Sequence, residues 1–218
     1  MKNMTNIRSK WDFLCGKLWA LNRDEVFDIL NAHYSEPHRH YHNFDHIIYC
    51  LDLADKVRGL NNKHCLELEL AIWFHDIVYS VTEPDNEEKS VILFNSSIDS
   101  LNAKVYISKV KVNSLILKTK NHKQTNSSSS LSNLMSDIDL AILGDEPEKY
   151  DVYEKNIREE YSFVPIDVYQ AARSNILNDF LLRDNIYHTS LLKPREKMAR
   201  ANLQRAINNL CVSQVNNL

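Results

Sequence analysis

The chain has 218 residues, of which 25% are charged, and its formal net charge is −3. This length can bury a sizeable core in one domain, and the charge favours neither a nucleic acid nor a membrane surface as a partner. There are only three glycines. So few exclude the glycine-rich phosphate loops of P-loop and dinucleotide-binding proteins, and they favour helices over a turn-rich sheet. We therefore expect a single all-α domain, a helical bundle over residues 1–218 with its core at about 11–210.

The first residues and the cysteines predict a cytoplasmic protein. The opening MKNMTNIRSKW holds no apolar stretch of a secretory signal, and no apolar run in the chain has the length of a transmembrane helix. The four cysteines are scattered without a C-x-x-C pair, which is typical of reduced thiols.

Apolar residues at helical spacing predict a succession of helices. In chain order we expect them at about 9–20, 23–34, 41–59, 63–80, 86–100, 104–121, 131–143, 147–161, 165–183 and 194–210. Gly59 and Gly144 are expected to end the third and the seventh of these helices. The serine-rich segment 121–133 has no apolar face and is predicted to form a mobile surface loop. The last helix has one apolar face and is expected to pack against the body.

The third predicted helix opens on a cluster of histidines in the segment PHRHYHNFDHII. If the helix begins within this segment, His42 and His46 lie four residues apart on one helix face. His38 and His40 suit a solvated loop, whereas His46 leads directly into an apolar stripe. His46 is therefore the candidate for a buried, functional histidine.

The fourth predicted helix, within LELELAIWFHDIVYS, is apolar nearly all round, which is typical of a buried helix. Its centre nevertheless carries His75 and Asp76 side by side. A buried carboxylate is costly unless it is hydrogen-bonded, paired with a cation or bound to a metal. Two interpretations stay open at this point, a satisfied His–Asp pair in the core and a metal site.

Two further carboxylates, Asp137 and Asp139, stand at the start of the apolar segment in LMSDIDLAIL. Asp137 suits an N-cap, whereas Asp139 is expected to lie deeper. Two histidines and two carboxylates on three helices would form a mixed nitrogen and oxygen ligand set. Such a set suits a divalent Mn, Fe, Co, Ni, Zn or Mg ion and does not select among them.

The pattern of one histidine, a His–Asp doublet and a distant aspartate resembles that of the HD-domain superfamily of metal-dependent phosphohydrolases. The segments YSEPHRHYHNFDHI, LELAIWFHDIVYS, DNEEKSV, DIDLAILG and EKMARANL occur in this order and look like its branch of predicted phosphohydrolases of about this length. The resemblance spans most of the chain, from about Trp11 to Leu210. It implies a helical bundle of the HD-domain type with a metal in a central cleft.

The resemblance also implies which residues hold the metal. The four ligands would be His46, His75, Asp76 and Asp139. Asp137 is the alternative to Asp139, because the register of this segment is open.

The activity that the resemblance implies is hydrolysis of a nucleotide or another small phosphate ester by a metal-activated water. Asp76 would bind the metal and orient the water. Glu87, in the segment PDNEEKS, is the candidate for a separate general base. The alternative for Glu87 is that it only places negative charge in the first turn of a helix.

A phosphorylated substrate calls for cationic or hydrogen-bonding neighbours. The candidates for substrate binding are Arg39, His42, Lys120, His122 and Arg173, with Arg39 and His122 ahead of the others. Each arginine or lysine among them also suits a surface position or a structural ion pair.

Two other functions stay open. A di-iron oxygenase of the same fold would need extra ligands, for which His42 and His122 are the candidates. A non-catalytic module that binds metal and a nucleotide would keep the ligands without turnover. A homodimer is one assembly that the sequence allows.

Overall fold

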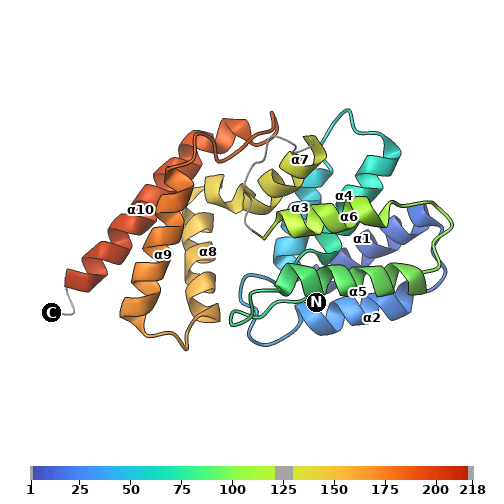
Figure 1. Ribbon diagram of the computed structural model, residues 1–218, viewed down its shortest axis with the longest axis horizontal. Helices are drawn as coiled ribbons and strands as arrows, with labels where there is room; N and C mark the ends of the chain where they lie inside the picture. The colour runs from blue at the N-terminus through green and yellow to red at the C-terminus, as the bar shows by residue number, and fades with distance from the viewer. Residues whose placement is uncertain (1, 121–129, 216–218) are drawn as a thin grey trace. The chain divides into compact units, whose positions relative to one another are not determined.

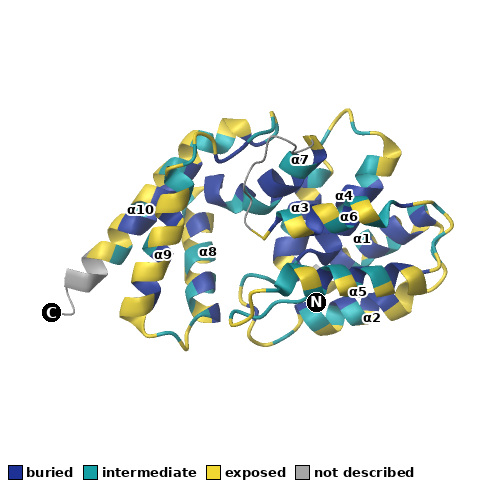
Figure 2. Cartoon of the chain, in the orientation of Figure 1, coloured by how far each residue is buried: buried dark blue, intermediate teal, exposed yellow. Residues whose placement is uncertain are grey.

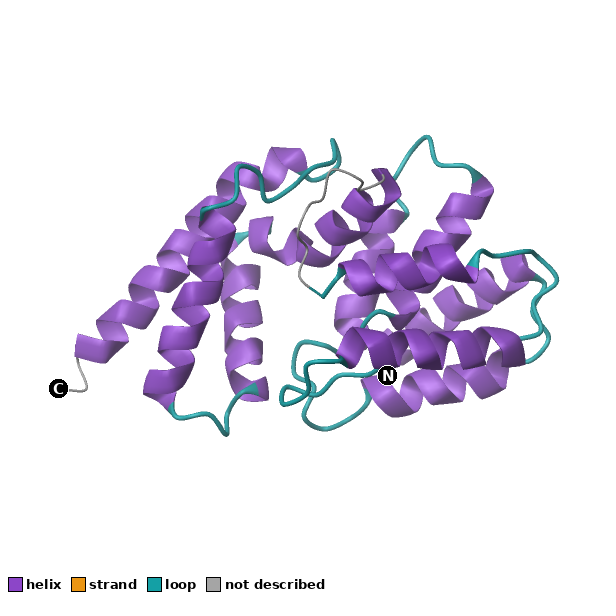
Figure 3. Ribbon diagram, in the orientation of Figure 1, coloured by secondary structure: helices purple, strands orange, loops and turns teal. Residues whose placement is uncertain are grey.

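The computed structural model describes residues 2–120 and 130–215, and all regular structure in these two ranges is helical (Figures 1 and 3). The α-helices are α1 (Lys2–Leu18), α2 (Arg23–Tyr34), α3 (Phe44–Ala54), α4 (Asn62–Phe74), α5 (Asn86–Ser100), α6 (Lys109–Lys118), α7 (Ser130–Asp139), α8 (Pro147–Glu160), α9 (Ile166–Leu181) and α10 (Glu196–Val215). Two short 3₁₀ helices, η1 (Leu140–Gly144) and η2 (Lys193–Arg195), complete them. The all-α prediction is confirmed for these residues. Within them, no helix combines the length and the apolar character needed to cross a membrane.

Several helix ends differ from the predicted ones. The predicted helices at 23–34 and 86–100 have the bounds of α2 and α5. Helix α3 begins only at Phe44, because the Asn43 side chain caps it by accepting a hydrogen bond from the backbone N–H of Asp45. It ends at Ala54, so the prediction that Gly59 ends it is wrong, and Gly59 lies in the connection with a φ of 85°.

The serine-rich segment is only partly described. Its residues 130–133 are helical, in the first turns of α7, so the predicted loop is wrong for them. Residues 121–129 lie outside the described residues.

The chain divides into two compact units, Met1–Ser136 and Asp137–Leu218. Each unit has its own buried core (Figure 2). That the whole chain forms one domain stays a prediction.

In the first unit, α4 is the central element and contacts α1, α3, α5 and α6. Its residues from Leu70 to Phe74 are all buried, as the apolar sequence predicts. The rings of Trp11 and Trp73 meet edge to face with their centroids 5.2 Å apart, and both side chains are fully buried. This packing holds α4 in place within the unit, and so it also holds in place the C-terminal end of the helix.

In the second unit, α10 packs against α9, α8 and η1, which confirms the expectation for the last helix. The buried Asn202 side chain donates hydrogen bonds to the backbone carbonyls of Leu143 and Asp145 at 3.0 and 2.9 Å. Gly144 ends η1 where no side chain fits, because a Cβ there would lie 2.7 Å from the Cβ of Arg195. Gly144 thus closes a helical turn, as predicted, although that turn is 3₁₀.

Candidate metal centre

The His75–Asp76 pair lies at the C-terminal end of α4, and not in the middle of a helix as predicted. The N–H of His75 still donates to the carbonyl of Ala71, at 2.9 Å. The carbonyls of Asp76 and Ile77 instead accept hydrogen bonds from a side chain, that of Arg39. In a longer helix these carbonyls would accept from backbone N–H groups of the next turn. Here the guanidinium of Arg39 takes the place of those N–H groups, and the helix ends.

The orientation of His75 is set by its ring Nδ1, which lies 2.9 Å from the carbonyl oxygen of Ile72. A carbonyl oxygen can only accept, so the proton is on Nδ1. The neutral ring then has its lone pair on Nε2, which is the form in which histidine binds a metal. His75 is 1% exposed.

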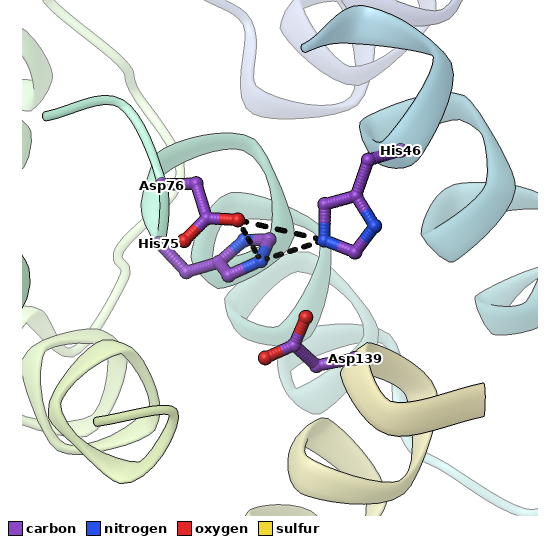
Figure 4. A group of neighbouring side chains, drawn as sticks. All are labelled: His46, His75, Asp76 and Asp139. Atoms are coloured by element: carbon purple, nitrogen blue, oxygen red, sulfur yellow. Dashed lines mark hydrogen bonds and ion pairs between the residues drawn. The ribbon is translucent and has the colours of Figure 1, made fainter. Parts of the chain in front are cut away.

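Three ligand atoms meet at this point (Figure 4). The Nε2 atoms of His46 and His75 are 3.2 Å apart, and Oδ2 of Asp76 lies 3.5 Å from the first and 3.1 Å from the second. A cation about 2.1 Å from each ligand separates neighbouring ligands by about 3.0 Å in an octahedron and about 3.4 Å in a tetrahedron. The three atoms are thus spaced for one cation between them.

The alternative interpretation, a satisfied pair without metal, has a hydrogen bond available inside the cluster. With the proton of His75 on Nδ1, its Nε2 can accept from the Nε2–H of His46, 3.2 Å away. The metal interpretation therefore rests on the spacing of the three ligand atoms around one point and on the mixed nitrogen and oxygen ligand set.

Asp139 is the last residue of α7, a helix that begins in the first unit and ends just past its boundary at Ser136. One ligand atom from each of His46, His75, Asp76 and Asp139 lies within 4.8 Å of the others (Figure 4). This is the group of four that the resemblance implies.

Asp137, the alternative to Asp139, is engaged elsewhere. It is 0% exposed, and its carboxylate accepts hydrogen bonds from the backbone N–H groups of His188 and Thr189, at 2.9 and 2.6 Å, and from the Thr189 hydroxyl at 2.6 Å. Burial raises the pKa of Asp137, and these hydrogen bonds lower it in part. The N-cap prediction for Asp137 is wrong, because α7 begins at Ser130 and Asp137 lies in its last turn.

Arg39, the first candidate for a substrate contact, is buried inside the first unit. Its guanidinium donates to the carboxylate of Glu36 and to the backbone carbonyls of His42, Asp76 and Ile77. Arg39 was predicted to contact a substrate phosphate. Its N–H donors are instead directed at acceptors within the protein.

His42 precedes α3, so the prediction that His42 and His46 share a helix face is wrong. The reason is the N-cap at Asn43, which starts the helix after His42. The two rings still lie near each other, with centroids 6.1 Å apart. His42 stacks on Tyr79 at a centroid distance of 4.1 Å.

The remaining cationic candidates form ion pairs. Lys120 is partly exposed, and its Nζ lies 2.6 Å from Oε1 of Glu88. Arg173 is buried in the second unit, where it donates to both carboxylate oxygens of Glu154 at 3.0 and 2.7 Å and to the Tyr153 hydroxyl. For both residues the contacts agree with the alternative of a structural ion pair. His122 lies outside the described residues.

Glu87 lies in the first turn of α5 and is half-buried. Burial raises the pKa of its carboxyl, and the negative charge of Asp76 raises it further. Lys120 acts in the opposite direction. Glu87 is thus a carboxyl that responds to the charge at the candidate site, which suits a group that exchanges protons there.

Comparisons of the chain with models of protein families, with curated proteins and with solved structures found no match. The assignment of a function therefore rests on the residues and their geometry.

Proposed function

We propose that the chain is a metal-dependent phosphohydrolase of the HD type, with one divalent cation bound by His46, His75, Asp76 and Asp139. The observation that carries this proposal is the meeting of the Nε2 atoms of two buried histidines and one oxygen of the half-buried Asp76 at 3.1 to 3.5 Å. The proposed substrate is a nucleotide or another small phosphate ester.

The charges of the four side chains support a divalent ion. Two neutral imidazoles contribute no charge, and two carboxylates balance a charge of about +2. The two nitrogen ligands favour Mn, Fe, Co, Ni or Zn over Mg, which prefers an all-oxygen shell. When bound, the cation would lower the pKa of a coordinated water towards neutrality and polarise a phosphoryl oxygen.

The chain's own groups would orient that water and accept its proton. Oδ2 of Asp76 lies 3.5 and 3.1 Å from the Nε2 atoms of His46 and His75, so Asp76 is the candidate both to bind the metal and to orient the water. Glu87 is the candidate general base, and its raised pKa makes it a stronger base than an ordinary glutamate. Lys120 lies close enough to Glu87 to lower the pKa of that carboxyl. To contact a substrate phosphate, as the sequence predicts, Lys120 would exchange its ion pair with Glu88 for the phosphate.

The proposal is tested by a screen of nucleotides and sugar phosphates with Mn, Co or Ni added to purified protein. We expect release of inorganic phosphate from at least one class of substrate, loss of this activity with a chelator, and its return when metal is added back. A protein that holds metal but releases no phosphate across the panel would contradict catalysis and support the non-catalytic binding module.

Glu87→Gln tests the general base. A base works only when deprotonated, and burial, the largest cause, raises the pKa of Glu87, so the rise of kcat with pH should shift upward by the part of the effect that burial supplies, since a cation on Asp76 would offset the charge of that carboxylate. We expect Glu87→Gln to lower kcat by about 10² to 10⁴-fold and to flatten this rise. Glu83→Gln is the control, because Glu83 is an exposed carboxylate paired with Lys89. An unchanged pH profile in Glu87→Gln would assign the proton transfer to another group.

A further inference from the structure

The guanidinium of Arg39 makes its hydrogen bonds inside the protein. Its side chain is 0% exposed. Nε donates to Oε2 of Glu36 at 2.8 Å, and the two terminal nitrogens donate to the carbonyls of His42, Asp76 and Ile77 at 3.0, 2.6 and 2.8 Å. The rings of Tyr34 and Tyr79 also lie close, with their centroids 5.2 and 5.6 Å from the guanidinium carbon.

The three carbonyls belong to the two segments that carry the candidate ligands. His42 stands directly before Asn43, the N-cap of the helix that carries His46. Asp76 is itself a candidate ligand and follows His75. One guanidinium therefore joins the backbone before α3 to the backbone after α4.

The guanidinium of an arginine is suited to joining two backbone segments, and the ammonium of a lysine is not. Its planar group directs several N–H donors in fixed directions, so it can hold carbonyls of two segments at once. A lysine has one compact donor group on a flexible stem and cannot reproduce that geometry. A positive charge is also favoured at the C-terminal end of α4, where the helix dipole is negative.

We propose that Arg39 is a positioning residue for the metal site. By holding the carbonyls of both segments, it brings Oδ2 of Asp76 and the two imidazole Nε2 atoms to their spacing before a cation binds. This inference rests on the metal site of the proposed function. It does not depend on the substrate or on turnover.

The test is a titration of the full chain with Co²⁺, followed by its visible absorption. Loss of a supporting hydrogen bond around a metal typically weakens metal binding about 10 to 100-fold, and we expect this loss of affinity in Arg39→Lys. We also expect the absorption of the Co²⁺-saturated variant to change, because the ligands no longer hold the same geometry. A loss of fold stability alone would not change the spectrum of the saturated protein.

Arg200→Lys is the matched control. Arg200 likewise donates to one carboxylate, that of Glu196, and to three backbone carbonyls, those of Leu181, Arg183 and Asp184. It does so within the second unit and touches none of the candidate ligands. We expect its Co²⁺ affinity to stay within about twofold of the wild type.

Glu36→Ala keeps the inference testable if Arg39→Lys does not fold. It removes the acceptor of Nε and leaves the three carbonyl contacts in place, so we expect a folded protein with several-fold weaker Co²⁺ binding. Wild-type affinity and spectrum in a folded Arg39→Lys, or in Glu36→Ala when only that variant folds, would overturn the role of Arg39 and leave the metal site standing. Failure of the wild type to bind Co²⁺ would overturn both.

Discussion

Replacement of His75 or Asp76 by alanine is expected to abolish metal binding and, with it, hydrolysis. Each change removes one of the three atoms that lie 3.1 to 3.5 Å from one another. Mutation of a residue that only supports a metal ligand lowers metal affinity about 10 to 100-fold. We therefore expect the loss of a ligand itself to lower metal affinity by more than about 100-fold. The measurement is a Co²⁺ titration of both variants beside the wild type.

Thermal unfolding provides a second readout of the same variants. A ligand that binds only the folded state stabilises it by about 2.7 kcal/mol at a concentration of 100 times its Kd. Added Co²⁺ should therefore raise the Tm of the wild type and leave that of His75→Ala and Asp76→Ala unchanged. His64→Ala is the control, since His64 lies near the other end of α4. An equal rise of Tm in all four proteins would place the metal elsewhere.

Asp137→Asn and Asp139→Asn are expected to fail in different ways. The carboxylate of Asp137 accepts three hydrogen bonds from residues 188 and 189, and an amide has only one oxygen to replace two. A hydrogen bond to a charged group contributes about 1.5 to 3 kcal/mol, so Asp137→Asn should lower the free energy of unfolding by about this amount. It should retain the metal once folded.

Asp139→Asn should instead show a large loss of metal affinity, because its carboxylate is one of the four candidate ligands. Denaturant unfolding of the metal-free proteins and Co²⁺ titration of the folded ones separate the two effects. Loss of metal in Asp137→Asn, with normal binding in Asp139→Asn, would reverse the register of the ligands.

The candidate ligands could be predicted because polar residues stand out in apolar sequence. His75 follows a run of buried residues and His46 heads an apolar stripe, so a buried position was predictable for both, whereas Asp76 is half-buried because α4 ends before it. The choice between Asp137 and Asp139 was harder from the sequence alone. Residues two apart lie about 200° apart around a helix, so the two carboxylates face different ways, and the contacts of Asp137 with residues 188 and 189 are made far along the chain.

The residue at which α4 ends and the contacts of Arg39 could not be predicted either, because they too depend on residues far apart in the sequence. Apolar periodicity continues past Phe74, and nothing local marks the point at which an arginine 37 residues away in sequence donates a hydrogen bond to the carbonyl of Asp76. The polar side chains of Asn86 and Ser90 act likewise, since they bind the backbone of Ser80 and Val78. Such contacts depend on the folded backbone and leave no periodic pattern.

Elemental analysis of freshly purified wild-type protein tests the central claim most directly, namely that His75 and Asp76 stand at the end of an apolar helix because they hold a metal. The proposed site predicts about one divalent transition metal ion per chain, removable by a chelator and restored by Mn, Co or Ni. Two irons per chain would favour the oxygenase instead of the phosphohydrolase. No bound metal, even after reconstitution, would contradict the site itself and leave a His–Asp pair without metal in a helical protein.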